Sequence, residues 1–410
     1  MKIAMVMSVY GKNAIGGAER TAAILANNLV SRGHEVSIVS LGAIDSKENS
    51  FATEFGATVW QLPLAQIYDP YGLDGVKQPP PTSTLKKALW HFLDVSNFKM
   101  SSRVRALFQK IKPDIVMTHT LQGFSVVVWK EAKSAGAKIL HMTHDHALIC
   151  PATAMTKGAK VCESVCAQCS VYSKMRKALA TPPDVVVGPS QIILDRHHKF
   201  GWFNQIKRML VIPNALPDTW PTIPPDLPTH STMVFGFLGR LDESKGIDTL
   251  LTAIKFLPKG SFKIKLGGQG DAQQLRLRWL ASEIPLDAVE FLGLVNAPEF
   301  LSSIDVLVTP SRAHETFCNV VMEAGCLGRP AIVSDRGALP ERVEHGNSGW
   351  IFPAGDAQEL AKLMQHCIEN PDEVFFKGKN AQSLRANYSS QVQCDKFEVL
   401  FQEMLLSSQI

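Results

Sequence analysis

The sequence predicts an α/β protein built from two doubly wound domains. Short apolar runs typical of buried parallel strands alternate along the 410 residues with segments that carry apolar residues at helical spacing. A chain of this length is too long for one ordinary hydrophobic core. Near its middle, the Pro-rich stretch 217–230 has the composition of a hinge between domains. We therefore expect one Rossmann-like domain over 1–216, a second over 231–390, and a helix over 391–410 that packs back towards the first.

Composition indicates a globular protein and excludes several classes of function. Apolar residues make up 45% of the sequence and charged residues 20%. The net charge of +4 is too small to indicate nucleic acid as a partner. Met1 leads directly into an apolar strand, and no apolar run reaches the length of a membrane span. We therefore expect a cytoplasmic protein without a secretory signal, whose cysteines are reduced or bound to metal.

The N-terminal domain begins with a strand, a loop and a helix. Residues 2–8, KIAMVMS, form the strand, and a glycine-containing loop over 11–17 precedes an amphipathic helix from Ala18 to about Gly33. The next strand is HEVSIVS, residues 34–40. Such a βαβ unit lets a ligand approach its first loop closely. The loop sequence IGGAER lacks the full G-x-G-x-x-G fingerprint, so it does not indicate NAD.

A basic amphipathic segment, Leu85–Ile111, follows a Pro-, Tyr- and Gly-rich surface excursion at 66–84. It has two interpretations: a solvated helix face over a core stripe, which is the ordinary one, or a contact with a membrane surface. Its apolar positions include Trp90, Phe92, Leu93, Val104, Leu107 and Phe108, and its basic ones Lys86, Lys87, Lys99, Arg103, Arg105 and Lys110.

Two further strands of this domain end in histidines. They are PDIVMTHT, residues 113–120, and AKILHMTHDH, residues 137–146, joined by a helix around Phe124–Ala135. Open α/β sheets bind ligands at the carboxyl ends of their strands. His144 with Asp145 is the better candidate there. His119 and His141 are also explained as satisfied polar residues near the core.

Half of the cysteines, Cys150, Cys162, Cys166 and Cys169, lie in one short insertion. Their spacing lets four thiolates converge on one ion, and four thiolates in a reducing compartment suit a closed tetrahedral zinc site. An iron–sulfur cluster also fits the ligand count, although we favour zinc. The alternative is a loop of free or redox-sensitive thiols. A site of four thiolates leaves no open coordination position, so we expect a structural role.

Strands at 184–190 and 209–216 close the first half, and the alternation restarts after the hinge. We expect strands at 234–240, 262–268, 289–295, 305–311, 330–335 and 349–352. The expected helices are Ile247–Leu257, one from Ala272, Phe317–Leu327, Ala357–Ile368, Glu373–Arg385 and Gln391–Leu406.

The most informative stretch of the second domain is a strand, a loop and a helix over 305–330. Peptides at the helix start, Thr316–Val320, offer amide groups and the positive end of a helix dipole to an anion, phosphate above all. A carboxylate there would repel phosphate, so Glu315 on the loop and Glu323 in the helix suit sugar or ribose hydroxyls. The alternative is that Glu315 caps the helix and Glu323 is a solvated charge.

Four motifs in order make residues 234–356, with the hinge before them, resemble glycosyltransferase family 4, of the GT-B fold. VIPNALPD at 211–218 is similar to V-I-P-N-G, and GRLDESKG at 239–246 to G-R-L-x-x-x-K-G. FLGLV at 291–295 resembles the segment beside the nucleobase, and SRAHETFCNVVMEA at 311–324 the family's serine loop and E-A helix. In the first domain, IGGAER resembles the family's G-G-x-E-R loop, and His144–Asp145 falls where the family keeps a cleft histidine. The resemblance covers nearly the whole chain.

The resemblance implies roles for these residues. Arg240 and Lys245 would hold the donor's diphosphate, and Glu323 the ribose hydroxyls. Glu315 would accept from sugar hydroxyls, and His144 would orient the sugar or the acceptor nucleophile. The remaining substrate-binding residues would be Gly16, Gly17, Asp145, Asn214, Gly239, Gly268, Leu294, Val295, Thr316, Phe317, Cys318, Asn319 and Val320.

This sequence departs from the family's pattern at the phosphate loop. Thr316 and Cys318 stand where the family commonly has the glycines of E-G-F-G, which stiffens the backbone that wraps the phosphates. Three residues rather than two separate Ser311 from Glu315, and Ala215 replaces the glycine of P-N-G. These changes keep open a second interpretation, an inactive nucleotide-sugar-binding or scaffold protein.

As a family member, the protein would be a retaining transferase of hexosyl type that needs no divalent metal or other catalytic cofactor. Its donor would be a UDP- or GDP-linked sugar, and its acceptor a glycan or a lipid-linked molecule in surface polysaccharide, lipopolysaccharide or glycolipid synthesis. A peripheral contact with the inner face of the membrane would go with such an acceptor. A glycosyl phosphorylase of the same fold would need a lysine for pyridoxal phosphate, and no motif indicates one.

Overall fold

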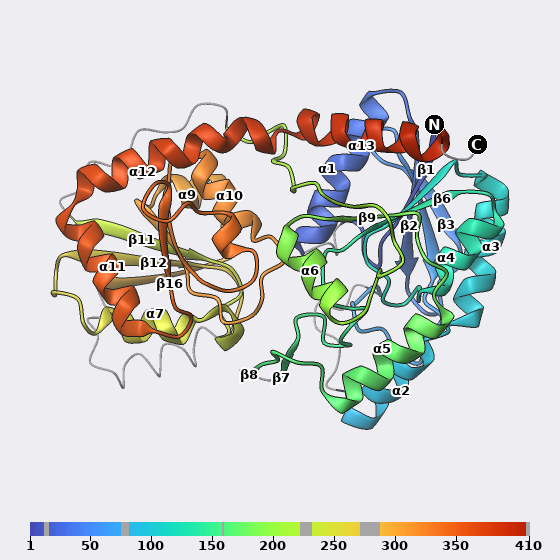
Figure 1. The fold of residues 1–410 in the computed structure, drawn as a ribbon, viewed down its shortest axis with the longest axis horizontal. Coiled ribbons are helices and arrows are strands. Elements are labelled where there is room, and N and C mark those ends of the chain that lie inside the picture. Colours follow the sequence, from blue (N-terminus) through green and yellow to red (C-terminus); the bar gives the residue numbers. More distant parts are fainter. Residues whose placement is uncertain (12–15, 75–81, 158–159, 222–231, 271–287, 407–410) are drawn as a thin grey trace. The chain divides into compact units, whose positions relative to one another are not determined.

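The computed structural model describes residues 1–11, 16–74, 82–157, 160–221, 232–270 and 288–406 (Figure 1). The chain divides into two compact units. Unit 1 holds residues 1–154, 163–215 and 390–410, and unit 2 holds 155–162 and 216–389. The expected helix from Ala272 and most of the expected hinge lie outside the described residues.

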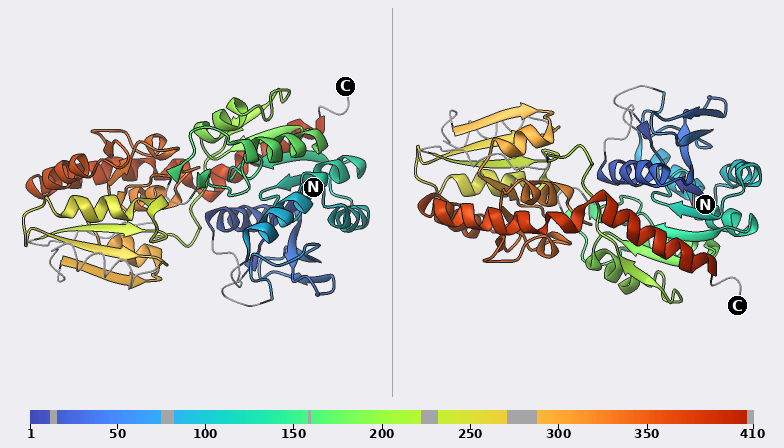
Figure 2. Two further views of the ribbon diagram at one scale, coloured as in Figure 1. Left: turned by 90° about the horizontal axis from the view of Figure 1, so that it is seen from below. Right: turned by 90° about the horizontal axis from the view of Figure 1, so that it is seen from above.

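Unit 1 is a sheet with helices on both faces (Figures 1 and 2). Within the described residues its strand order is β10-β9-β6-β5-β1-β2-β4-β3, and only β3 runs antiparallel, to β4. The strands are β1 (Lys2–Val6), β2 (Glu35–Gly42), β3 (Asn49–Ala52), β4 (Thr58–Pro63), β5 (Ile115–Thr118), β6 (Lys138–Met142), β9 (Val185–Gly188) and β10 (Met209–Val211).

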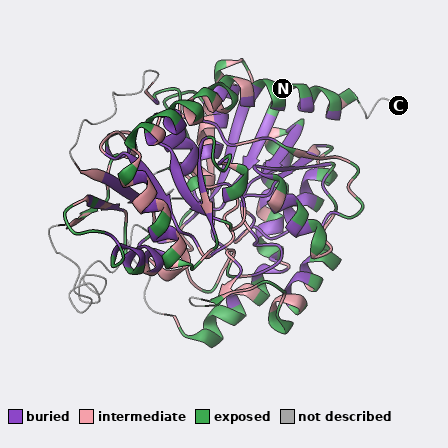
Figure 3. Cartoon of the chain, turned by 60° about the vertical axis from the view of Figure 1, so that its left-hand side comes forward, coloured by how far each residue is buried: buried purple, intermediate pink, exposed green. Residues whose placement is uncertain are grey.

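Helices of unit 1 bury apolar side chains at this sheet, and α1, α4 and α6 pack on its strands directly (Figure 3). Leu25 and Leu29 of α1 meet Phe397 and Phe401 of α13 in one core cluster. On the opposite face, Trp129 of α4 lies edge-on to His141 of β6, with ring centroids 5.1 Å apart. The helices are α1 (Gly17–Ser31), α2 (Thr84–Asp94), α3 (Phe98–Ile111), α4 (Val127–Ser134), α5 (Ala167–Leu179), α6 (Gln191–Lys199) and α13 (Ser390–Leu406).

Unit 2 repeats the plan with a parallel sheet, whose described strands have the order β13-β12-β11-β14-β15-β16. Its strands are β11 (Met233–Leu238), β12 (Phe262–Gly267), β13 (Val289–Gly293), β14 (Val306–Thr309), β15 (Ala331–Ser334) and β16 (Gly349–Phe352). Helices α7 (Ile247–Ile254) and α11 (Ala357–Glu369) cover one face, and α9 (Ala297–Ser302) and α10 (Asn319–Cys326) the other. Helix α12 (Pro371–Ser383) packs on α10, and the short hairpin β7 (Thr156–Lys157) and β8 (Lys160–Val161) completes the unit.

These α/β sheets confirm the predicted fold class, with three local differences. Elements β3, β4, α5, α6, α9 and the β7–β8 hairpin were not predicted from the sequence. The expected helix 85–111 is two helices. The first ends at Asp94 with Val95 as its C-cap, and Asn97 caps the second by accepting from the amide of Met100 at 3.2 Å. The expected helix from Phe317 begins at Asn319, since Cys318 has a left-handed backbone with φ +67°.

Candidate active site

The candidate site of unit 2 lies where the strand order reverses, between β11 and β14. In open α/β sheets ligands bind at such a point, outside the carboxyl ends of the strands. The loop after β11, 239–246, and the loop after β14, 310–318, are tied together there. The amides of Arg312 and Ala313 donate to the Ser244 carbonyl oxygen at 2.9 and 3.0 Å. Gly246 fits so tightly that a Cβ would lie 1.8 Å from the Pro310 carbonyl oxygen.

This junction brings Lys245 and Glu315 together. Lys245 Nζ lies 2.7 Å from Glu315 Oε1, and the Ser311 hydroxyl donates to the same oxygen at 2.6 Å. Their side chains are only 27% and 12% exposed. Burial alone would raise the pKa of Glu315, but Lys245, Ser311 and Arg240 together lower it. Burial opposes the Lys245 charge, but Glu315 raises the Lys245 pKa above its usual value. Both groups are therefore charged at neutral pH.

Arg240 adds a second cation beside this pair. Its side chain is 67% exposed, and Nε lies 3.3 Å from Asp242 Oδ2. Its positive charge contributes to the lowered pKa of Glu315. Two cations therefore face the same carboxylate, and one of them is open to solvent.

The start of α10 supplies a third positive feature. Cys318 is its N-cap residue and makes no side-chain capping bond, and Asn319 and Val320 form its first turn. Phe317 is buried under the guanidinium of Arg342, 4.4 Å from the ring centroid, which fixes the loop from Glu315 through Thr316. Glu323, in the second turn, is only 5% exposed. The alternative of a solvated surface charge at Glu323 is therefore wrong.

Further predicted residues gather at the same carboxyl edge of the sheet. The Gly239 amide donates to the Gly267 carbonyl at 3.0 Å, and the Gly268 amide to the Gly293 carbonyl at 2.6 Å. A Cβ on Gly268 would lie 1.8 Å from the Gly239 carbonyl oxygen, so the two loops are in close contact. Leu294, just past β13, is 72% exposed, and Val295 packs on the core beside it.

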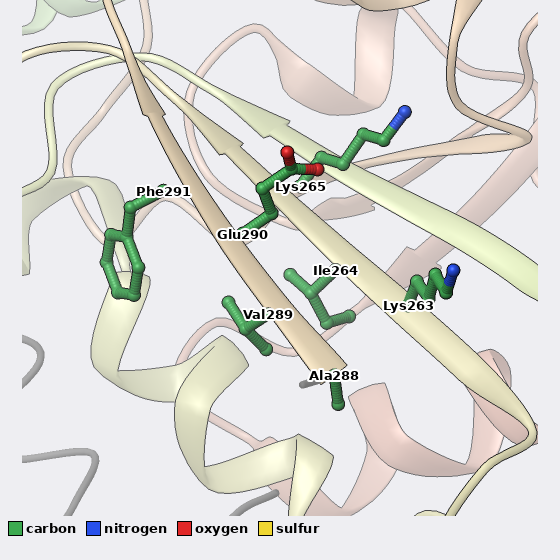
Figure 4. A pocket seen from close by; sticks show the side chains of 7 residues that line it. All are labelled: Lys263, Ile264, Lys265, Ala288, Val289, Glu290 and Phe291. Carbon is green, nitrogen blue, oxygen red and sulfur yellow. The ribbon is translucent and has the colours of Figure 1, made fainter. Parts of the chain in front are cut away.

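A surface hollow in unit 2 shares no residue with this predicted set (Figure 4). Its volume is about 380 Å³, and it lies along β12 and β13 before their carboxyl ends. It is lined by Lys263, Ile264, Lys265, Ala288, Val289, Glu290 and Phe291. We do not assign it to the site, because the ligand edge of the sheet is elsewhere.

In unit 1 the strand order also reverses, between β1 and β5, and buried histidines follow the strands there. His119 Nδ1 lies 3.0 Å from His144 Nε2, and the two rings are stacked. One ring must donate this hydrogen bond and the other accept it. Burial lowers the pKa of His144 to about 4, and burial with the neighbouring His144 and His141 lowers the pKa of His119 well below its usual value. Sequence reasoning gave His119 no preferred role, although its place at a strand end was the available signal.

The remaining candidates of unit 1 have different surroundings. His141 bonds the Thr118 hydroxyl at 2.9 Å in the core, as expected of a satisfied polar residue. Asp145 accepts from the Ala147 amide at 2.7 Å, and burial raises its pKa to about 6. Gly16 is the N-cap residue of α1 and Gly17 its first residue. Asn214 is buried near the end of the second segment of this unit.

The cysteine segment is only partly assembled. Cys169 Sγ lies 3.4 Å from Cys150 Sγ, and the Cys166 and Cys169 thiols are also hydrogen-bonded to each other. Burial and these two thiols raise the pKa of Cys169 far above its usual range. Among the residues that the structure describes, no three His, Cys, Asp or Glu side chains are arranged to hold a metal ion.

Comparison with known proteins identifies the family. Residues 15–219, half of the chain, match the family model described as Glycosyltransferase Family 4. The chain belongs to glycosyltransferase family 4. Residues 232–370 of this glycosyltransferase match a second model, Glycosyl transferases group 1.

Its relatives include proteins of bacterial polysaccharide gene regions. It is 31% identical over 342 residues to an uncharacterized 42.6 kDa protein in the cps region of Klebsiella pneumoniae. The matched segment covers 83% of this chain and 87% of that protein. It is also 31% identical to the amylovoran biosynthesis glycosyltransferase AmsK of Erwinia amylovora, over 35% of this chain and 38% of that one.

Solved structures confirm the GT-B fold of two Rossmann-like domains. Sucrose-phosphate synthase from Thermosynechococcus elongatus superposes with a TM-score of 0.75 at 20% identity, over 99% of this glycosyltransferase and 100% of the other chain. HepE from Anabaena, solved in complex with UDP and glucose, superposes with a TM-score of 0.72 at 18% identity. The match covers 98% of this chain and 100% of the HepE chain.

Proposed function

We propose that this glycosyltransferase moves a sugar, with retention of anomeric configuration, from a nucleotide-diphosphate sugar to a glycan or lipid-linked acceptor. The observation that carries the proposal is the Lys245–Glu315 pair at the reversal point of the unit 2 sheet, with Arg240 beside it. We place the reaction in surface polysaccharide synthesis on the cytoplasmic side, because the similar proteins include AmsK and a cps-region protein. HepE binds UDP and glucose, which favours a UDP-linked donor over a GDP-linked one.

The leaving diphosphate would be held by the cations of unit 2. Fixed cations and oriented amide groups stabilise charge that develops as the bond to the anomeric carbon breaks. In the free protein Lys245 pairs with Glu315. We propose that the donor diphosphate forms an ion pair with Lys245 instead, which leaves the Glu315 carboxylate available to accept hydrogen bonds from the sugar hydroxyls. Glu323 would accept from the ribose, and the loop residues Gly239, Gly268, Leu294 and Val295 would line the nucleotide.

Unit 1 would hold the acceptor. Neutral His144, fixed by its bond to His119, would orient the sugar or the attacking hydroxyl. Asp145 and the Gly16–Gly17 turn would contribute polar groups nearby, and Asn214 would support the loop after β10. No divalent ion takes part in this proposal, so transfer should continue in excess chelator.

The first test is thermal stabilisation by UDP, GDP, ADP and CMP. A nucleotide at about 100 times its Kd should add roughly 2.7 kcal/mol to the free energy of unfolding. Arg240→Ala should lose that stabilisation, and its kcat/KM should fall by a factor of about 100 or more. Lys259→Ala, which removes an exposed cation outside the site, is the matched control. Near-normal kcat/KM in Arg240→Ala would contradict the assignment.

A second function, nucleotide-sugar binding without transfer, is favoured by one observation. Cys318 holds a left-handed backbone conformation at a position where the family commonly has glycine. Nucleotide stabilisation with neither transfer nor donor hydrolysis, across candidate acceptors, would support it. Measured turnover of a UDP-sugar would exclude it.

A structural zinc ion at Cys150, Cys162, Cys166 and Cys169 also remains a proposal. The support is their spacing and the close approach of Cys150, Cys166 and Cys169. We expect about one zinc per chain in protein purified without added metal. Protein free of both zinc and iron would leave the thiols as free cysteines.

A further inference from the structure

The loop before α10 is held by a buried aromatic ring. Phe317 stands between Thr316 and Cys318, and its side chain is only 2% exposed, in the core cluster on the α10 face of the sheet. A ligand at the helix start can therefore meet the Phe317 backbone but not its ring. Whatever holds the ring also determines where the amide groups of this loop lie.

Two side chains from later in the sequence hold this ring. Tyr388 ends the short 3-10 helix η5 (Leu384–Tyr388) and meets Phe317 edge-on, with ring centroids 6.3 Å apart and ring planes at 80°. The Arg342 guanidinium lies 4.4 Å from the Phe317 ring centroid and donates to the Tyr388 hydroxyl at 3.5 Å. Both ring contacts are attractive, because the face of an aromatic ring is negative and its edge positive. We call Phe317, Arg342 and Tyr388 the aromatic clamp.

The aromatic clamp is tied to the place where the chain enters and leaves unit 2. The main segment of this unit is 216–389. Its first amide, that of Leu216, donates to the Tyr388 carbonyl oxygen at 2.9 Å, one residue before the segment ends. Arg385, also of η5, donates to the carbonyl oxygen of Cys326, the last residue of α10, at 3.2 Å. The two ends of the segment and α10 are therefore held by one short helix.

The conformation of the loop needs such support. Cys318 has φ +67°, and a residue other than glycine keeps this conformation only where its surroundings hold it. The Cys318 side chain makes no capping bond to α10, so the helix start does not secure the conformation by itself. The neighbouring Phe317 ring, fixed by Arg342 and Tyr388, provides the missing anchor.

We infer that Tyr388 is a positioning residue for the donor diphosphate. It acts through Phe317, which places the amide groups at the start of α10. Through Leu216 it also links the occupancy of the phosphate site to the segment by which the chain enters the unit. Tyr388 itself would touch neither donor nor acceptor, and it lies outside every motif that resembles the family. This inference rests on the proposed function, in which the diphosphate binds at the start of α10.

The first test is the affinity of the full chain for UDP by isothermal titration calorimetry, at a temperature where every variant is folded. Tyr388→Ala should raise the Kd for UDP by roughly fivefold to tenfold, the size of one aromatic contact. Tyr388→Phe keeps the ring and should stay within about twofold of the wild type. If Tyr388→Ala does not fold, Tyr388→Leu, which keeps apolar volume without the ring, should show the weaker binding in its place.

The matched control for lost stability is Leu363→Ala. Leu363 is a partly buried apolar residue of α11 on the other face of the sheet. Its truncation should lower the melting temperature, as Tyr388→Ala does, and leave the Kd for UDP at the wild-type value. A loss of UDP affinity in Leu363→Ala as well would assign the effect to general destabilisation and overturn the inference.

The second measurement is hydrogen exchange at the Leu216 amide, with and without UDP. In the wild type UDP should slow this exchange, because a filled phosphate site holds the aromatic clamp and with it the Tyr388 carbonyl oxygen. In Tyr388→Ala the amide should exchange equally fast with and without UDP. If Tyr388 only stabilises the fold, its removal would speed exchange but leave the difference made by UDP intact, and that result would overturn the inference.

The wild type separates failure of this inference from failure of the proposed function. Normal UDP binding by the wild type, with an unchanged Kd in Tyr388→Ala, would overturn the inference and leave the proposed function standing. Absence of nucleotide binding by the wild type itself would contradict the proposed function, and this inference with it.

Discussion

At the scale of single residues, Glu315 and Cys318 define the loop before α10. Glu315 is held by Lys245 and Ser311, and its charge is balanced inside the protein before any ligand arrives. Three residues later, Cys318 has φ +67°, a conformation that costs an ordinary residue about 1–2 kcal/mol and glycine almost nothing. The loop is thus rigid and slightly strained.

Substitutions at Cys318 test this strain. Cys318→Gly should change the free energy of unfolding by less than about 1 kcal/mol. Glycine removes the backbone strain at positive φ, and this gain offsets the lost packing of the side chain and the greater freedom of the unfolded chain. Cys318→Val should lose roughly 1–2 kcal/mol, since a β-branched residue is poorly tolerated at positive φ. Urea unfolding measures both. Equal stability of the two variants would show that the backbone at 318 carries no strain.

At the scale of elements, a buried ion pair joins α2 to α5. Arg176 and Asp94 are both fully buried, and Asp94 also accepts from the Gly123 amide at 2.8 Å. Burial raises the pKa of Asp94 to about 7, and Arg176 opposes that rise. The pair therefore fixes the position of α2 on α5.

Removal of one partner should cost more than removal of both. Arg176→Met should lower the free energy of unfolding by about 3 kcal/mol, because it leaves a buried carboxyl without its cation. Adding Asp94→Asn should restore a large part of that loss. A double-mutant cycle by urea unfolding at pH 7.5 gives the coupling. If the two single losses simply add, the pair is not coupled.

At the scale of the whole molecule, acid should destabilise the fold through buried histidines of unit 1. Burial lowers the pKa values of His119, His141, His144 and His197, the last two to about 4. The unfolded chain takes up these protons near pH 6.5, so the stability from neutral histidines is complete above that pH and falls as pH drops towards 4. Asp94 and Asp145, with raised pKa values, act in the opposite direction, but the four histidines outnumber them.

We therefore expect a lower free energy of unfolding at pH 5 than at pH 7.5. His197→Phe should reduce the difference by roughly 2 kcal/mol, because one depressed pKa is removed. His197 is a suitable test, since it lies on α6 and packs on Phe203 with ring centroids 5.7 Å apart. Asp145→Asn should instead steepen the loss. Unfolding free energies that are flat across this range would contradict the neutral state of the histidines.

The alternating α/β plan and most of the candidate residues could be predicted from the amino-acid sequence alone. Periodicity identified β1, β2 and β16 almost to the residue, because buried parallel strands are continuous apolar runs bounded by turns. It missed β3, β4 and α9, since short elements carry too few residues for a pattern, and it also left the longer α5 and α6 unpredicted. The order of the motifs indicated Arg240, Lys245, Glu315 and Glu323. Each motif is a short contiguous stretch of sequence, so it can be recognised without knowledge of the fold.

Which of these residues come into contact depends on the three-dimensional fold and could not be predicted from the sequence. Lys245 and Glu315 are 70 residues apart in sequence, and strand pairing across the reversal between β11 and β14 brings them together. The same holds for His119 and His144, which neighbouring strands place at one edge. Periodicity also could not orient α2, because an apolar stripe looks the same in sequence whether it meets a core or solvent. The orientation of α2 is set by Trp90 and Asp94, whose side chains pack inward.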